Sequence, residues 1–127
     1  MNTQRTILPS ASRTSPAGTI VDIDNTEDYR SAIVVMDVTA DPETGVVAVV
    51  IQGKDILSGE YYDILISAAI VSVGTTILHV GDGTADLDDF ARGTRLPRVW
   101  RIDAVHADTD SITYSIAADL STGPARA

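Results

Sequence analysis

Short runs of β-branched residues, each closed by residues that favour turns, follow one another through most of this 127-residue chain. Isoleucine and valine dominate the runs, and branching at Cβ suits a pleated strand better than a helix. A clear example is SAIVVMDVTA at residues 31–40, which ends in the turn sequence DPETG. No helical pattern of about 10–15 residues separates the runs, so they predict antiparallel sheets.

Alternation of apolar and polar residues within the runs predicts one inward and one outward face. Trp100 and Ile102, for example, alternate with Arg101 and Asp103. Two such sheets packed face to face give an all-β fold, an antiparallel β-sandwich or jelly roll of about seven or eight strands. The predicted strands are residues 18–24, 31–40, 46–52, 61–70, 75–80, 98–107 and 111–118. One short helical turn is predicted at residues 85–92.

The predicted core consists of large apolar side chains at inward positions. They are Val34, Met36, Val38, Val49, Ile64, Ile66, Leu78, Val80, Trp100, Ile102, Ile112, Tyr114 and Ile116.

Composition shifts divide the chain into three parts. Residues 1–17 are rich in Ser, Thr, Arg and Pro and predict an extended N-terminal arm, residues 18–120 form the β-sandwich domain, and residues 121–127 form a short polar tail. We expect the arm to dock on a neighbouring protein, with Ile7 and Leu8 as apolar anchors and Arg13 as a further interface residue. The alternative is a disordered terminus.

The charge balance restricts the partners. Eighteen acidic residues against nine basic ones give a net charge of −9, which disfavours binding to nucleic acid. The first residues lack the apolar core of a signal peptide, and no apolar run is long enough to cross a bilayer. We therefore expect a soluble protein, made in a cytoplasm, without nucleic-acid or membrane partners.

Catalytic chemistry finds no support in the sequence. There is no cysteine, and His79 and His106 lie within strand patterns, outside any nucleophile or metal-ligand motif. Neither a phosphate-binding nor a dinucleotide-binding glycine motif is present. We expect a non-enzymatic protein without a cofactor.

An Asp- and Gly-rich loop is the nearest approach to a metal site. Asp82, Asp86, Asp88 and Asp89 could contribute oxygen ligands to calcium, but their spacing does not match the twelve-residue calcium loop. A solvated turn, with Asp86 or Asp88 as a helix cap, explains the loop as well. We therefore expect no metal, and these four residues remain weak candidates.

A basic window runs against the charge of the whole chain. Arg92, Arg95, Arg98 and Arg101 fall within ten residues, with Trp100 beside them. Arginine is enriched at interface hot spots and forms bidentate pairs with carboxylates. The window could meet carboxylates of a second copy or of another protein, or pair within its own chain.

The order of elements resembles a group of small phage virion structural proteins of the capsid decoration type. The resemblance rests on RTSP at residues 13–16 leading into GTIVDID, on YRSA at 29–32, on VAVVI at 47–51 and on SITYSI at 111–116. It implies a β-sandwich or jelly-roll module on a virion, self-associating, for example as trimers, and binding the major capsid protein or other virion proteins. Capsid decoration or cementing on the outer surface of a phage head is the function expected from it.

Two other functions remain open. The first is a different virion component, such as a head–tail connector, a tail protein or the base of a head fibre. The second is a free β-sandwich module that binds carbohydrate or protein. Sugar sites usually present exposed aromatic residues, whereas Trp100, the single tryptophan, falls in a core-facing register.

Overall fold

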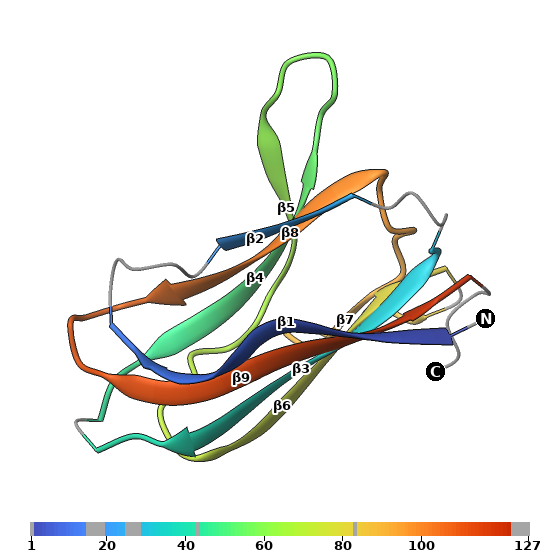
Figure 1. Cartoon of the computed structure of the whole chain (residues 1–127). Coiled ribbons are helices and arrows are strands. Elements are labelled where there is room, and N and C mark those ends of the chain that lie inside the picture. Colours follow the sequence, from blue (N-terminus) through green and yellow to red (C-terminus); the bar gives the residue numbers. More distant parts are fainter. Residues whose placement is uncertain (1, 15–19, 25–28, 43, 83, 123–127) are drawn as a thin grey trace.

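The computed structural model describes residues 2–14, 20–24, 29–42, 44–82 and 84–122. Nine strands lie within these ranges (Figure 1). They are β1 (Asn2–Arg13), β2 (Ile20–Asp24), β3 (Ser31–Ala40), β4 (Val47–Lys54), β5 (Tyr61–Ile66), β6 (Gly74–Gly81), β7 (Ala91–Arg92), β8 (Val99–His106) and β9 (Ile112–Ser121).

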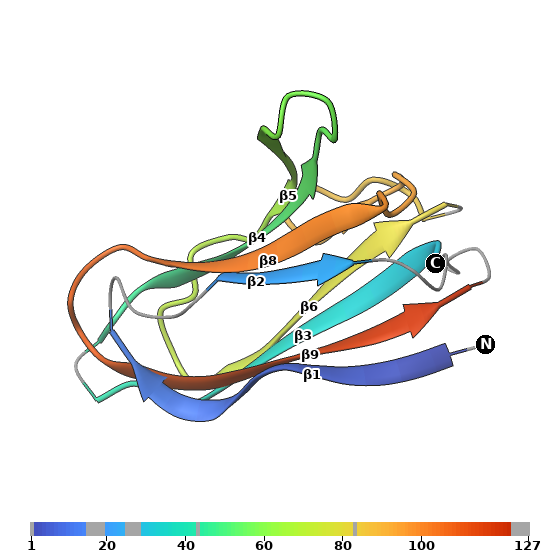
Figure 2. The ribbon, with the colours of Figure 1, turned by 45° about the horizontal axis from the view of Figure 1, so that its top comes forward.

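Two sheets form a sandwich, which confirms the predicted fold class. One sheet has the order β1-β9-β3-β6-β7 and the other the order β2-β8-β4-β5. Without the two-residue β7, the chain passes from sheet to sheet in the order of an eight-stranded jelly roll. Figure 2 shows the two sheets as separate layers.

The described residues contain no helix, and therefore none that could span a membrane. The helical turn predicted at residues 85–92 is wrong. The backbones of Leu87 and Ala91 bond to each other in both directions across a tight turn, and β7 then pairs in parallel with β6. These mutual bonds, together with the bond from the N–H of His79 to the carbonyl of Phe90, satisfy backbone groups in place of a helix.

The core lies between the sheets, and all but two of its predicted members are buried. The exceptions are Ile64, which is half-buried, and Ile66, which is 45% exposed. A register shift between Ile51 and Gln52 in the pairing of β4 with β5 changes the phase, so that Leu65 points inward instead. Buried hydrophobic residues that the prediction did not include are Ile7, Leu8, Ile23, Tyr29, Ala32, Val47, Val50, Ile51, Leu65, Ala91, Leu96, Ala104, Ala118 and Leu120.

The predicted boundary between an N-terminal arm and the sandwich domain is wrong, because the N-terminal segment is a strand of the sandwich. Residues 2–13 form β1, which pairs antiparallel with β9 from Asn2 opposite Ser121 to Arg13 opposite Ile112. Ile7 and Leu8 are buried in the core of their own chain, so neither is available to anchor an arm on a neighbour. Residue 1, residues 15–17 of the predicted arm and residues 123–127 of the predicted tail lie outside the described residues.

Candidate interaction surfaces

The β4–β5 hairpin stands out from the body of the sandwich in both views (Figures 1 and 2). Its tip, residues 55–60, is wholly exposed. Ile56 is 81% exposed and Leu57 is 95% exposed. Two neighbouring large aliphatic side chains held in water at the end of a projection are the most exposed apolar pair among the described residues.

Hydrogen bonds give the hairpin tip a defined shape. Asp55 organises it: the backbone N–H of Leu57 and the hydroxyl of Ser58 donate to its two carboxylate oxygens, at 3.1 and 2.9 Å. The N–H of Gly59 donates to the carbonyl of Asp55 at 2.7 Å, and the φ of Gly59 is +79°, a conformation that glycine adopts without strain. These bonds to the carboxylate, led by that from Leu57, lower the pKa of Asp55.

The stem of the hairpin is fastened to β8 through Arg101. Its guanidinium lies over the ring of Tyr61, 3.6 Å from the ring centre, and its Nε donates to the side-chain oxygen of Gln52 at 2.6 Å. The amide nitrogen of Gln52 donates to Asp63 at 2.7 Å. The ammonium of Lys54 also lies over Tyr61. The base of the projection is therefore cross-linked by side chains while its tip remains uncovered.

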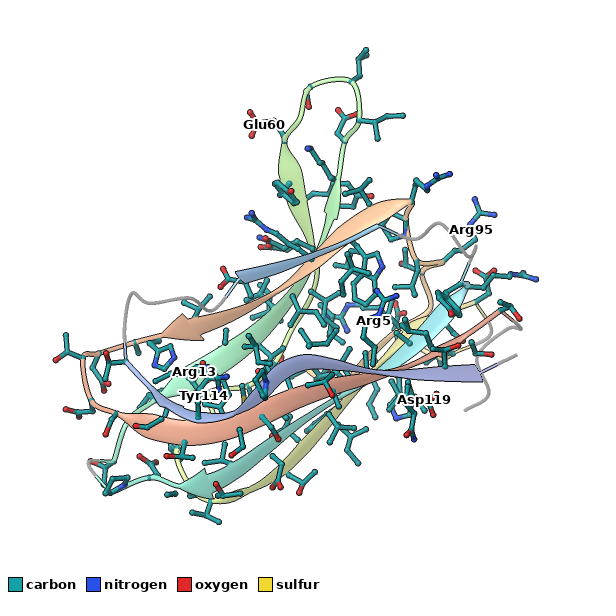
Figure 3. All side chains as sticks on the ribbon, viewed as in Figure 1. Arg5, Arg13, Glu60, Arg95, Tyr114 and Asp119 are labelled. Atoms are coloured by element: carbon teal, nitrogen blue, oxygen red, sulfur yellow. The ribbon has the colours of Figure 1, made fainter. Side chains whose placement is uncertain are left out.

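The predicted arginine window is not one surface. Arg92 donates to the carbonyls of Asp88 and Ala91, and Arg101 belongs to the hairpin stem. Arg98 is exposed and engaged in a further contact, and Arg95 is exposed. Figure 3 shows Arg95 and Arg13 at opposite ends of the sandwich. Three of the four arginines are therefore engaged within their own chain, and Arg95 is the exposed cation that remains for an interface.

Arg13 is likewise bound within its chain, in a cluster at one end of the sandwich (Figure 3). Its guanidinium donates to the carbonyls of Pro9, Ala11 and Tyr114 and lies over the Tyr114 ring, 4.9 Å from the ring centre. A hydrogen bond of 2.9 Å joins the Tyr114 hydroxyl to Nε2 of His106. This cluster ties β1 to β8 and β9.

Burial sets the ionisation of this cluster. It raises the pKa of Tyr114 to about 12 and lowers the pKa of His106, whose Nδ1 is buried without a hydrogen-bond partner among the described residues. Arg13 also lowers the pKa of His106, while Asp108 and Asp103 raise it. Burial raises the pKa of Asp103 itself. A buried tyrosine with so high a pKa stays protonated, and the cluster closes the end of the core.

Protonation of His106 should cost stability. Its pKa in the fold lies below the ordinary 6.5, so its contribution is complete above pH 6.5 and is lost as the pH falls toward the lowered value. Asp103 has a raised pKa, so its contribution to stability is complete below about pH 3.8 and is lost as the pH rises toward the raised value. When the pH is lowered from 7.5 to 5.5, across the ordinary histidine pKa of about 6.5, the melting temperature of His106→Gln should therefore fall less than that of the wild type. Equal losses in the two proteins, measured by calorimetry, would contradict this assignment.

The predicted aspartate loop does not assemble a metal site. Among the described residues, no three His, Cys, Asp or Glu side chains come together in a way that could hold a metal ion. Asp82 forms an ion pair of 2.8 Å with Arg30, and Asp86 accepts a hydrogen bond from the N–H of Gly93 at 2.8 Å. The loop instead fastens neighbouring segments. Gly83, inside it, lies outside the described residues.

Comparison with known proteins adds no assignment: no protein-family model and no curated protein sequence matches the chain.

The sequence contains a signal for the exposed hairpin tip that the predicted interface residues do not include. Ile56 and Leu57 stand between Asp55 and the pair Ser58-Gly59, so an apolar pair occupies a segment whose neighbours favour a turn. A short turn that connects paired strands projects its side chains into solvent. That pattern alone indicates exposed apolar residues.

Proposed function

We propose that this chain is a non-enzymatic virion structural protein that decorates the outer surface of a phage head, with the major capsid protein as its partner. The β4–β5 hairpin carries the proposal as the attachment contact. Its apolar tip has no role inside the domain, and burying Ile56 and Leu57 on a partner would recover about 25 cal/mol for each Å² of apolar area removed from water.

The order within the tip favours a binding role. A loop that is already held in its bound shape loses little conformational freedom on binding. The Asp55 carboxylate and the Gly59 turn hold Ile56 and Leu57 at the end of the projection before any partner arrives. Small interfaces gain useful affinity when such rigid anchors fill an apolar pocket.

Charge indicates what kind of pocket the tip would enter. Asp55 and Glu60 flank the apolar pair, and Glu60 extends from the hairpin in Figure 3. The chain as a whole carries a net charge of −9. An apolar pocket with a basic rim on the shell protein would complement both features.

The jelly-roll topology is compatible with this proposal but does not select it, since viral capsid proteins and lectins share the fold and fold alone does not define function. A sugar-binding module is less well supported. Trp100, the single tryptophan, is buried in the core, where it cannot stack on a sugar. Counting copies per particle would separate decoration, with many copies, from a connector or fibre base, with few.

Replacing the apolar pair of the tip should weaken attachment without unfolding the domain. Purified chain would be mixed with undecorated phage heads and its saturation measured. Ile56→Ser/Leu57→Ser should weaken binding at least about tenfold, because truncating a central apolar anchor costs about 2 kcal/mol or more.

Leu87→Ser is the matched control, since Leu87 is also exposed, at 59%, but lies in the β6–β7 connection away from the hairpin tip. It should bind as the wild type does. If the wild-type chain binds no virion component, the proposed function fails. Binding that survives the double substitution would reject the hairpin as the contact.

A further inference from the structure

A stretch of the chain without charge lies at the surface. Residues 65–80 contain no Asp, Glu, Lys or Arg, although the chain has 27 such residues (18 acidic and 9 basic). Three of its apolar side chains, Val71, Val73 and Ile77, are 45–61% exposed, and Phe90 beside them is 49% exposed. Exposed, uncharged and apolar surface of this kind is typical of an interface.

The same stretch contains an open sheet edge. β6 lies at the border of its sheet, and β7 pairs with it only at His79 and Val80. The N–H of His79 donates to the carbonyl of Phe90, so it points toward this edge. Because strand residues alternate in direction, the N–H and C=O groups of Thr75 and Ile77 face the same edge. They lie before the point at which β7 begins to pair with β6.

The other border of this sheet is protected, and β6 is not. β1 carries Pro9, two register shifts and the charged residues Arg5 and Arg13. Proline, bulges and charges are the devices that prevent strands from adding to an edge. Residues 74–78 of β6 (GTTIL) have none of them.

A hollow of about 340 Å³ adjoins the open edge. It is lined by residues 68–76 and by Phe90, so the first residues of β6 form part of its wall. Side chains of a strand added to β6 would find apolar surface there.

We infer that this edge is a self-association site, at which residues 74–78 of two copies pair antiparallel about a two-fold axis. With Thr76 opposite Thr76, Thr75 of each copy lies opposite Ile77 of the other. In that register both pairs are hydrogen-bonded pairs, and all of the edge-facing groups of Thr75 and Ile77 are satisfied. The same segment therefore supplies both halves of the interface, as a two-fold contact requires.

The uncharged surface accepts a second copy despite the net charge of the chain. Two chains of net charge −9 repel each other, and this surface brings them together without opposing carboxylates within residues 65–80. Asp37 lies just behind the edge, with its carboxylate 3.5 Å from the Thr75 hydroxyl. Added salt should therefore strengthen the association by screening the remaining repulsion. The inference does not depend on the proposed virion role.

Sedimentation of the purified full-length chain over a range of concentrations tests it. The wild type should show a reversible monomer–dimer equilibrium. Ile77→Pro removes an N–H that faces the open edge and not β3, so the domain should fold and the dimer dissociation constant should rise at least about tenfold. Ile77→Val keeps the donor and should dimerise like the wild type.

A second variant covers the case in which proline disturbs the strand. Ile77→Glu changes an exposed side chain and would place a carboxylate near Asp37 of the other copy, so it should also raise the dissociation constant, most strongly at low salt. Melting curves would establish that each variant is folded. A wild type that stays monomeric throughout its soluble range, or a folded Ile77→Glu variant that dimerises unchanged, overturns the inference.

Discussion

A chain that lacks residues 2–13 should lose cooperative folding. The deletion removes Ile7 and Leu8 from the core and uncovers β9 along its length. Burial of two large aliphatic side chains contributes about 3–6 kcal/mol, against a total stability of about 5–15 kcal/mol for a domain of this kind. The bonds from Arg13 to the Tyr114 carbonyl and between Tyr29 and Thr3 are lost as well.

Urea titration followed by circular dichroism measures the effect, with the full-length chain as reference. A peptide of residues 1–14 added in trans should restore part of the transition, because it can pair with the vacated edge of β9. A truncated chain that unfolds at the same urea concentration as the full chain would contradict the assignment of β1 to the sandwich. It would also restore the alternative of a dispensable arm.

Ile116→Ala should destabilise the domain by about 2–5 kcal/mol, the usual cost of truncating a buried aliphatic side chain. Ile116 is fully buried in β9, between Leu8 of β1 and Met36 of β3. The melting temperature should fall by about 10 °C or more.

Its neighbour Ser115 provides the control. Ser115 points to the outer face, opposite Asp37 in the ladder, and Ser115→Ala should change the stability by less than about 0.5 kcal/mol. Calorimetry of the two variants tests the register of β9 directly. Similar losses at both positions would mean that the strand does not present alternate residues to the core.

Regular alternation made much of the fold predictable. β9 alternates between inward and outward residues over its full length, and β3 and β8 do so over most of theirs. The predicted positions of all three agree with the structure to within a few residues. The order of the strands in the sheets was not predictable, because the pairing of β9 with β1 and β3 depends on contacts between segments far apart in the sequence.

The failures occur where bulges interrupt the alternation. In β1 the register shifts between Thr6 and Leu8 and again before Ala11, so two adjacent residues, Ile7 and Leu8, are both buried. A segment with that pattern, containing Pro9 and several serines, does not resemble a strand in the sequence. For the same reason, the register shift between β4 and β5 places Leu65 in the core, where Ile66 had been predicted. A pattern of period two cannot locate an inserted residue.

The candidate surfaces were less predictable than the fold. The arginine window was visible in the sequence, but the carbonyls around Arg92 and the Tyr61 ring beneath Arg101 become neighbours only after folding. The open edge of β6 depends on the short length of β7, which no local pattern indicates.

The pairing of β1 with β9 also governs when the domain can form. On the ribosome β1 emerges long before its partner and must remain unpaired until residues 112–121 have been made. Nearly every other pairing is similarly distant, and the β4–β5 hairpin is the one antiparallel pair of consecutive strands among the described residues. Such a high contact order places folding in the millisecond-to-second range. Asn2 and Ser121 then lie opposite each other at the same end of one sheet, and β9 must be made before the domain can close.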